Sequence, residues 1–174
     1  MTNARDRKGI AMTKHTDVIA RNKAVVRAYY DGAEPGIGRT KMNQPIESSN
    51  KALVLEAFDT LFNKRDYVAA ERYWSPNYIQ HSAHIAPGRD GLFTLVKSLP
   101  PTLKYERGTI VAERDLVIVH GRFSGFGQPT AWIAADILRL ADGVLAEHWD
   151  VIQDEATRES SKSGLPMFGE QFGA

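Results

Sequence analysis

The second half of the sequence carries four strand-like segments in a row, and this run constrains the fold more than any other feature. Short turn sequences separate the segments, including Ala-Asp-Gly at 141–143, which is a hairpin signal. Because strands joined by tight turns pair antiparallel, the run predicts an antiparallel meander. The four segments span residues 104–115, 116–127, 130–140 and 144–153.

Three amphipathic segments with helical spacing precede these strands. Ser49 is the expected N-cap of the first helix and Asp66 that of the second, while Pro100 stops the third. A short extended segment at 77–81 lies between the second and third helices. Helices segregated from an antiparallel sheet define an α+β fold, so we expect a curved sheet that closes around a pocket with the helices as its lid. The predicted helices span residues 50–63, 67–74 and 89–99.

The chain of 174 residues is long enough for one domain with two extensions. Residues 1–48 are predicted to form an N-terminal extension, with one helix at 17–31 and a linker rich in Gly and Pro. Residues 49–153 form the predicted domain, and residues 154–174 form a polar C-terminal tail. The basic start of the chain is not followed by an apolar segment, so we expect no signal peptide.

Composition excludes several classes of function. Apolar residues make up 43 % and charged residues 25 %, which predicts an ordinary globular core. The net charge of +1 and the lack of a basic stripe speak against nucleic-acid binding, and no apolar run approaches the roughly 18 residues of a membrane span. The chain has no cysteine, which excludes disulfides and cysteine nucleophiles and fits a cytoplasmic protein.

Ionisable residues stand in otherwise apolar strands and are the strongest candidates for a site. Side chains alternate along a strand, so Asp136 shares a face with Trp132, and His148 shares a face with Asp150. His120 lies in a third apolar strand. A buried carboxyl group must be paired or must change its protonation state. Asp136 is therefore a candidate acid or base, and the alternative is a structural Asp bonded to a nearby Arg or backbone amide.

Two histidines form an H-x-x-H pair in a loop. His81 follows an extended segment and is expected at the pocket edge, whereas His84 is expected to be a solvated loop residue. No third ligand is obvious near the pair, so we expect no metal site, although a metal hydrolase built on these two residues is an alternative. Trp149 alternates away from His148 and is expected to pack behind the sheet or in a dimer interface.

Two stretches resemble the SnoaL-like group of the NTF2-like superfamily: NKALVLEAFDTLFNKRDYVAAERYWSPNYIQHSAHIAPGRDGL at 50–92 and DILRLADGVLAEHWDVIQ at 136–153. The resemblance covers residues 50–153 and leaves residues 1–48 outside the pattern. It implies a cone-shaped α+β barrel, in which three helices wrap a curved antiparallel sheet around a deep pocket. It also implies a homodimer.

The resemblance further implies a mechanism. Cyclases of this group, named polyketide cyclases, close a ring by intramolecular aldol condensation without a metal or an organic cofactor. An aspartate on a late strand serves as acid or base, and Asp136 in ADILR matches it. His120 matches a histidine on the preceding strand, and His81 and His148 match pocket-facing positions. Trp132 is expected to wall the pocket.

The sequence therefore favours a cofactor-free enzyme of carbonyl acid/base chemistry: a cyclase, an isomerase or a lyase. Its expected substrate is a small, mostly apolar ketone, because apolar walls with few polar groups suit such a molecule. Burial raises the pKa of an aspartate toward working pH, and His or Trp N–H groups can stabilise an enolate oxygen. The alternative is a non-catalytic ligand-binding or dimerisation module, because a fold does not fix a function.

Overall fold

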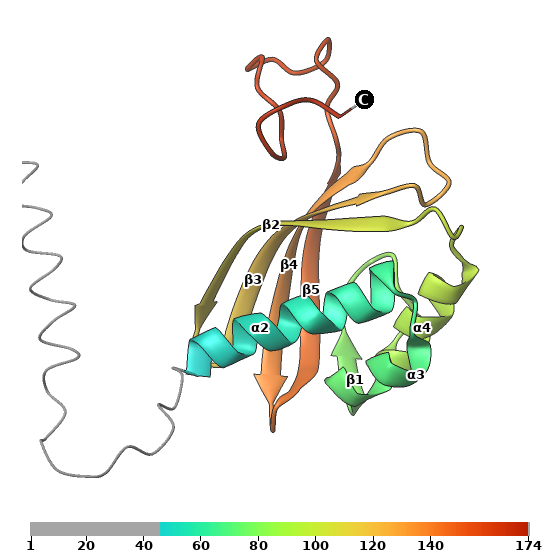
Figure 1. Ribbon diagram of the computed structural model, residues 1–174, viewed down its shortest axis with the longest axis vertical. Helices are drawn as coiled ribbons and strands as arrows, with labels where there is room; N and C mark the ends of the chain where they lie inside the picture. Colours follow the sequence, from blue (N-terminus) through green and yellow to red (C-terminus); the bar gives the residue numbers. More distant parts are fainter. Residues whose placement is uncertain (1–45, 174) are drawn as a thin grey trace, which may run out of the picture. The chain divides into compact units, whose positions relative to one another are not determined.

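The structure, a computed structural model, describes residues 46–173, which form a curved five-stranded sheet with its helices on one face (Figure 1). The strand order is β1-β5-β4-β3-β2; β2 to β5 pair antiparallel, and β1 pairs parallel with β5. The predicted α+β class is confirmed. In chain order the elements are α2 (Ile46–Phe58), η1 (Asp59–Asn63), α3 (Tyr67–Ala70), η2 (Glu71–Tyr73), β1 (Trp74–Gln80), α4 (Gly88–Ser98), β2 (Lys104–Glu113), β3 (Leu116–Ser124), β4 (Trp132–Ala141) and β5 (Val144–Asp154).

The first helix starts earlier than the sequence predicts. It begins at Ile46, so Ser49 lies inside the helix and is not its N-cap. Glu47 occupies the first turn, where a negative charge interacts favourably with the helix dipole. The last turn of this segment is π-helical and ends at Asn63, whose side-chain amide bonds the backbone of Tyr105 twice, at 3.1 and 2.9 Å. This pair of bonds fixes the helix end to the start of β2.

The predicted cap of the second helix is confirmed. The Asp66 carboxylate accepts a hydrogen bond from the backbone N–H of Ala69 at 3.0 Å. The helix is shorter than predicted, because Trp74 already belongs to β1 and is buried at 2 % exposure. The extended segment therefore begins at Trp74 rather than at residue 77.

Arg65 holds the end of α4 in place. Its guanidinium donates hydrogen bonds to the backbone carbonyls of Val96, Leu99 and Pro100, at 2.9, 3.0 and 3.2 Å. The last carbonyls of a helix lack partners within the helix, and here one side chain supplies them. This contact positions α4, and α4 forms one wall of the cavity described below.

The hairpin predicted at 141–143 is confirmed. Asp142 and Gly143 both adopt positive φ, at 52° and 75°, between the paired residues Ala141 and Val144. Two successive residues with positive φ are the requirement of the two-residue turn whose twist matches antiparallel strands. Two residues beyond the turn, a bulge between Leu140 and Arg139 shifts the register of β4 on β5 by one residue. The shifted register sets which side chains of the two strands face the helices.

The two faces of the sheet differ in what covers them. The face under the helices carries the core, including Val119, Leu138 and Leu145, each fully buried. The other face, called the outer face here, is partly open. A cross-strand row on it consists of Val111, Ile118, Ile137 and Trp149. Its exposed apolar side chains are Ile79, Val111, Leu116, Ile118 and Val151.

Residues 155–173 form a tail without helix or strand that folds back on the sheet. Glu155 anchors its start by bonding Arg122 at 2.8 Å. Further along, the ring of Phe168 lies 5.5 Å from the imidazole of His120, centroid to centroid. The predicted N-terminal helix at 17–31 lies outside the described residues.

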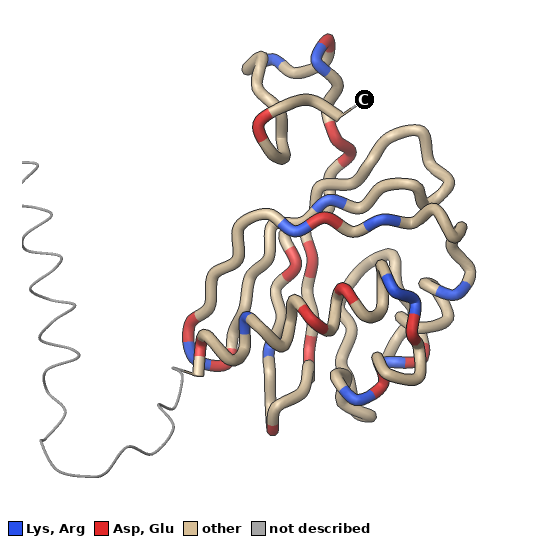
Figure 2. Tube along the Cα trace, viewed as in Figure 1, with Lys and Arg blue, Asp and Glu red and all other residues tan. Residues whose placement is uncertain are grey.

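Charged residues of both signs intermingle along the described trace (Figure 2). None of the helices within residues 46–173 is long and apolar enough to cross a membrane. The cytoplasmic location stays a prediction.

Gly121 is required by the packing of the core. A Cβ atom at this position would lie 2.6 Å from Cε2 of Tyr105, whose ring crosses over the glycine. That ring is held by Phe58 and Phe123, at centroid distances of 5.2 and 4.8 Å. The tyrosine therefore has little room to move away from a larger residue.

We expect Gly121→Ala to lower the free energy of unfolding by about 1–3 kcal/mol, because overpacking a rigid aromatic cluster forces strained side chains. Urea denaturation of the variant and the parent protein measures this difference. Shortening the opposing ring in a Gly121→Ala/Tyr105→Leu variant should make the glycine substitution less costly than it is in the parent background. An unchanged denaturation midpoint in Gly121→Ala would contradict this account of the core.

Candidate functional site

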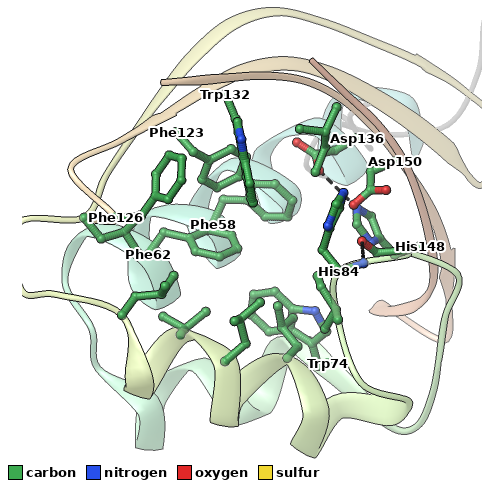
Figure 3. A pocket seen from close by; sticks show the side chains of 18 of the residues that line it. Phe58, Phe62, Trp74, His84, Phe123, Phe126, Trp132, Asp136, His148 and Asp150 are labelled. Carbon is green, nitrogen blue, oxygen red and sulfur yellow. Dashed lines mark hydrogen bonds and ion pairs between the residues drawn. The ribbon is translucent and has the colours of Figure 1, made fainter. Parts of the chain in front are cut away.

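A cavity of about 200 Å³ lies between the helices and the inner face of the sheet. Aromatic rings form one side of it and carboxyl and imidazole groups gather at the other (Figure 3). α4 contributes an aliphatic wall. Its aromatic lining consists of Phe58, Phe62, Trp74, Tyr78, Phe123, Phe126 and Trp132. The cavity is thus an apolar pocket with one polar end.

The polar end is built around a hydrogen bond between Asp136 and His148. The imidazole Nε2 of His148 lies 3.0 Å from Oδ1 of Asp136. Both residues are buried, at 4 % and 5 % exposure. Asp136 lies opposite Asp150 in the β4–β5 register, and His148 is the next inward-facing residue of β5. The hairpin register therefore brings the acid and the imidazole together.

Burial raises the pKa of Asp136 above its ordinary value. The hydrogen bond and the charge of His148 oppose this rise, and the nearby carboxylate of Asp150 adds to it. A carboxyl group in such surroundings titrates closer to neutral pH than a solvated one, which is the property of a general acid or base.

Three buried polar atoms near this end have no hydrogen-bond partner within residues 46–173. They are Oδ2 of Asp136, Nε1 of Trp74 and Nε2 of Gln80. Orphaned buried polar groups are costly and rare, and these three combine one acceptor with two donors. The hydroxyl of Tyr78 also belongs to the lining, and burial raises the pKa of Tyr78 far above its ordinary value, so this hydroxyl stays a donor. Asp136, Trp74 and Tyr78 line the cavity, so a bound molecule with an oxygen acceptor and a donor group would satisfy Nε1 of Trp74 and Oδ2 of Asp136.

Four of the predicted site residues lie on the cavity. Asp136, His148, Asp150 and Trp132 all line it, as the strand alternation predicts. His84 also lines it, and its ring lies 5.3 Å from that of Trp132. His84 is an exposed residue of the loop after β1, as the sequence predicts, and it is also part of the cavity lining.

His120 does not reach the cavity. Val119 lies opposite Asp136, and His120 lies opposite Ala135 on the outer face, where it meets Phe168. The expectation that His120 stands beside Asp136 is corrected by the register of β3 on β4. We assign it no part in the site.

His81 is also turned away from the cavity. Its imidazole stacks on Trp149 of the outer face, with centroids 4.9 Å apart, and Nε2 lies 2.8 Å from Oε1 of Glu147. Arg139 donates a hydrogen bond to the other oxygen of that carboxylate. The hydrogen bond from His81 lowers the pKa of Glu147 most, and the hydrogen bond from Arg139 lowers it further. No group of three His, Asp or Glu residues that could hold a metal ion exists within residues 46–173.

Gln80 is the site residue that the sequence analysis missed. It lies on β1 opposite His148, and its Oε1 is 2.9 Å from Nδ1 of that imidazole. Alternation from the buried Trp74 would have placed Tyr78 and Gln80 on the inner face, one residue away from His81. His81 was predicted as a site residue because imidazole groups often take part in catalysis. The alternation of side chains along the strand places Gln80 on the inner face instead.

Comparisons with known proteins agree with this architecture. The model of the SnoaL-like domain matches residues 54–148, more than half of the chain. AclR from Streptomyces galilaeus, a proposed hydroxylase, shares 28 % identity with a TM-score of 0.51, over 62 % of this chain and 80 % of that one. No curated protein matches the sequence significantly.

Two further solved structures share the fold at lower identity. A proposed ketosteroid isomerase from Kribbella flavida is 14 % identical with a TM-score of 0.57, covering 73 % of this chain and 97 % of that one. A proposed polyketide cyclase from Acidithiobacillus ferrooxidans is 16 % identical with a TM-score of 0.53, covering 63 % and 92 %.

The curved sheet, the helical cover and the cavity between them are those of an NTF2-like fold. The chain belongs to the SnoaL-like domain family. The family resemblance seen in the sequence is confirmed.

The raised pKa of Asp136 predicts how stability depends on pH. Its carboxyl titrates near 3.8 when unfolded and at a higher pH when folded, so the folded state holds the proton more tightly. The contribution of this group to the free energy of unfolding is therefore greatest below pH 3.8. This contribution is lost as pH rises through the pKa of the folded state. Asp136→Asn removes this titration.

We therefore expect Asp136→Asn to gain stability relative to the parent protein as pH rises from about 3.8 toward neutrality. Urea denaturation at a series of pH values measures the difference. Asp154→Asn, at an exposed carboxyl on the same sheet, controls for the loss of one acid. A difference that shrinks with rising pH would show that the folded state favours the ionised form.

Proposed function

We propose that the protein catalyses proton transfer at a carbon next to a carbonyl group, with Asp136 as the acid and base. The observation that carries this proposal is the carboxyl itself: it is buried at the polar end of an apolar cavity, and only one of its oxygens is bonded. A structural aspartate would have its second oxygen satisfied by an Arg or a backbone amide. Among residues 46–173 neither is bonded to it.

The reaction needs a base for the carbon-bound proton and donors for the resulting enolate oxygen. Asp136 is suited to the first role because burial moves its pKa toward working pH. Tyr78 and Trp74 are suited to the second, since both line the cavity and carry an O–H or N–H group. The C–H electron pair moves into the enolate, and the proton moves to the carboxylate. Return of the proton at another carbon gives isomerisation, and attack of the enolate on a second carbonyl gives ring closure.

The walls support a small, flat, mostly apolar ketone as substrate. Aromatic rings line the side of the cavity away from Asp136 (Figure 3), and such rings favour planar apolar molecules. A volume of about 200 Å³ suits a molecule smaller than a typical drug. Membership of the SnoaL-like family adds support, because the cyclases that the sequence resembles carry out an intramolecular aldol condensation.

Exchange of carbon-bound hydrogen tests the proposal without knowledge of the natural substrate. Deuterium uptake by a panel of cyclic and aromatic β-diketones is followed by NMR with and without protein. We expect acceleration by the parent protein and a loss of about 10²–10⁴-fold in Asp136→Asn, the usual contribution of a general base. Asp154→Asn should retain the parent rate. Equal rates in parent and Asp136→Asn would remove Asp136 from the chemistry.

A non-catalytic ligand-binding module is the second candidate function. The observation in its favour is that most of the cavity wall is apolar, with aromatic rings gathered on one side (Figure 3). This candidate predicts that the same diketones bind, as measured by calorimetry, while the protein leaves their hydrogen exchange unchanged.

We also propose that a second copy of the chain covers the outer face. Its five exposed apolar side chains retain between 40 % and 67 % exposure, which is unusual for neighbouring residues on a monomer. Charges on this face are largely neutralised within the chain: Glu147 is bonded to Arg139 and His81. Two copies of such a face can meet without repulsion, as a two-fold symmetric dimer requires.

Sedimentation of the full chain over a range of concentrations tests the dimer. We expect the parent protein to sediment as a dimer, and Ile118→Asp to sediment as a monomer because it introduces an unpaired charge into the apolar row. Val68→Asp is the matched control, since Val68 is 85 % exposed on α3 and lies away from this face. A parent protein that stays monomeric at high concentration would overturn the proposal.

A further inference from the structure

Gln80 connects the polar end of the cavity to the backbone of the loop after β1. Its Oε1 accepts a hydrogen bond from the backbone N–H of Ser82 at 2.9 Å and lies 2.9 Å from Nδ1 of His148. The same imidazole bonds Asp136 through its other nitrogen, at 3.0 Å. The three side chains therefore form a chain from β1 through β5 to β4.

The orientation of the Gln80 amide is fixed by its backbone contact. A backbone N–H can only donate, so the atom that faces Ser82 must be the amide oxygen. The reversed amide would set an NH₂ group against an N–H group, with two donors facing each other. The atom that faces Nδ1 of His148 is thus also an oxygen. An oxygen accepts, and Nδ1 must therefore carry a proton.

This protonation has a consequence for the other side of the ring. With Nδ1 protonated, the neutral imidazole has a bare acceptor at Nε2. A hydrogen bond of 3.0 Å from Nε2 to Oδ1 of Asp136 needs one proton between the two atoms. That proton is either on the carboxyl group or on the imidazole. In both cases Asp136 and His148 hold one proton more than a carboxylate beside a neutral imidazole.

We propose that Gln80 is a positioning residue: it holds His148 in the Nδ1–H form, so that His148 and Asp136 share one proton between Nε2 and Oδ1. Loss of the shared proton would leave two acceptors facing each other at 3.0 Å in a buried site, which is unfavourable.

The link to catalysis rests on the proposed function. Because Oδ1 is committed to His148, the unbonded Oδ2 is the oxygen left for a substrate proton. In the carboxylate–imidazolium arrangement, the substrate C–H bond breaks, a new O–H bond forms on Oδ2, and the electron pair stays on the enolate. The imidazolium remains protonated throughout, and the carboxyl group then returns the proton to carbon. Gln80 sets which oxygen of Asp136 reacts without touching the substrate.

Other ionisable groups face this pair and bear on its titration. Asp150 of β5 and Tyr78 of β1 line the same cavity, as does His84 of the following loop. The hydroxyl of Tyr105, on β2, is also buried without a partner among the described residues. Burial raises the pKa of this tyrosine, and the charge of Asp136 adds to the rise. β3 presents the apolar Val119 opposite Asp136, and α2 and α4 present apolar side chains.

Nitrogen NMR of the full-length protein tests the inference without any substrate. Long-range ¹H–¹⁵N spectra of ¹⁵N-histidine-labelled protein distinguish the two ring nitrogens, and comparison with His148→Gln assigns the signals. We expect Nδ1 of His148 to remain protonated at every pH at which the protein is folded. A parent spectrum with a proton on Nε2 and none on Nδ1 would overturn the proposal, whatever the variants do.

Two variants of Gln80 sharpen the test. Gln80→Glu keeps an acceptor and adds negative charge, so the shared proton should be lost at a pH higher by roughly 1–3 units, as expected for a nearby opposite charge on an imidazolium. Gln80→Leu removes the acceptor, so His148 should show a mixture of both tautomers. Gln153→Leu, an exposed glutamine of β5, is the control and should leave the signals unchanged. An unmoved titration in Gln80→Glu would contradict the proposal even if Gln80→Leu fails to fold.

The pH profile of hydrogen exchange separates this inference from the proposed function. If both hold, Gln80→Glu moves the upper limb of the profile by the same shift that NMR records. If the NMR result holds while Asp136→Asn exchanges deuterium at the parent rate, the proposed function alone fails. If exchange depends on Asp136 while Nδ1 lacks its proton, the role of Gln80 alone fails.

Discussion

The site depends on one constraint: a carboxyl group is enclosed in an apolar cavity with a single imidazole as its bonded neighbour. The cost of burying Asp136 is limited by the bond to His148, and that bond in turn depends on Gln80 for its geometry. Because both side chains are buried, the hydrogen bond between them is stronger than it would be in water. Arg65 contributes indirectly by fixing α4, which forms one wall of the cavity. The fold thus keeps the carboxyl group of Asp136 out of bulk solvent.

Alternation within each of the last two strands predicted which site residues share a face: Asp136 with Trp132, and His148 with Asp150. The turn at Asp142 and Gly143 does not bring the two rows together by itself, because a bulge between Arg139 and Leu140 shifts the β4–β5 register by one residue. Without this bulge Asp136 would lie opposite Trp149, and a bulge of this kind cannot be recognised from the turn sequence. The family resemblance pointed to the same aspartate.

The position of His120 could not be predicted in the same way. Both faces of β3 are apolar, with Val117 and Val119 on one and Leu116 and Ile118 on the other. Hydrophobicity therefore did not say which row faces the core. The register that decides it is a contact between strands, and the sequence of one strand does not contain it. The presence of His120 in an apolar strand led to the prediction that its row faces the cavity, whereas that row lies on the outer face.

Elements with irregular geometry account for the other differences. The sequence predicts Trp74 as the end of a helix, whereas in the structure it begins β1. The alternation from Trp74 through Tyr78 to Gln80 was therefore not recognised, and His81 was chosen instead of Gln80. The first helix starts ahead of its best capping residue, since Ile46 and Glu47 also suit a helix. Such local departures from ideal geometry are where sequence patterns carry the least information.

The parallel pairing of β1 with β5 has a consequence for how the site comes into being. Gln80 and His148 are 68 positions apart in the chain, and β1, which carries Gln80, joins the sheet beside β5. Closing a loop of this length precedes any gain from the contact, so such pairings slow folding. The meander can assemble from local hairpins, whereas the tautomer-setting contact forms only when the two ends of the domain meet. The contact between Gln80 and His148 thus depends on completion of the fold, and a partly folded chain would carry Asp136 without an ordered imidazole beside it.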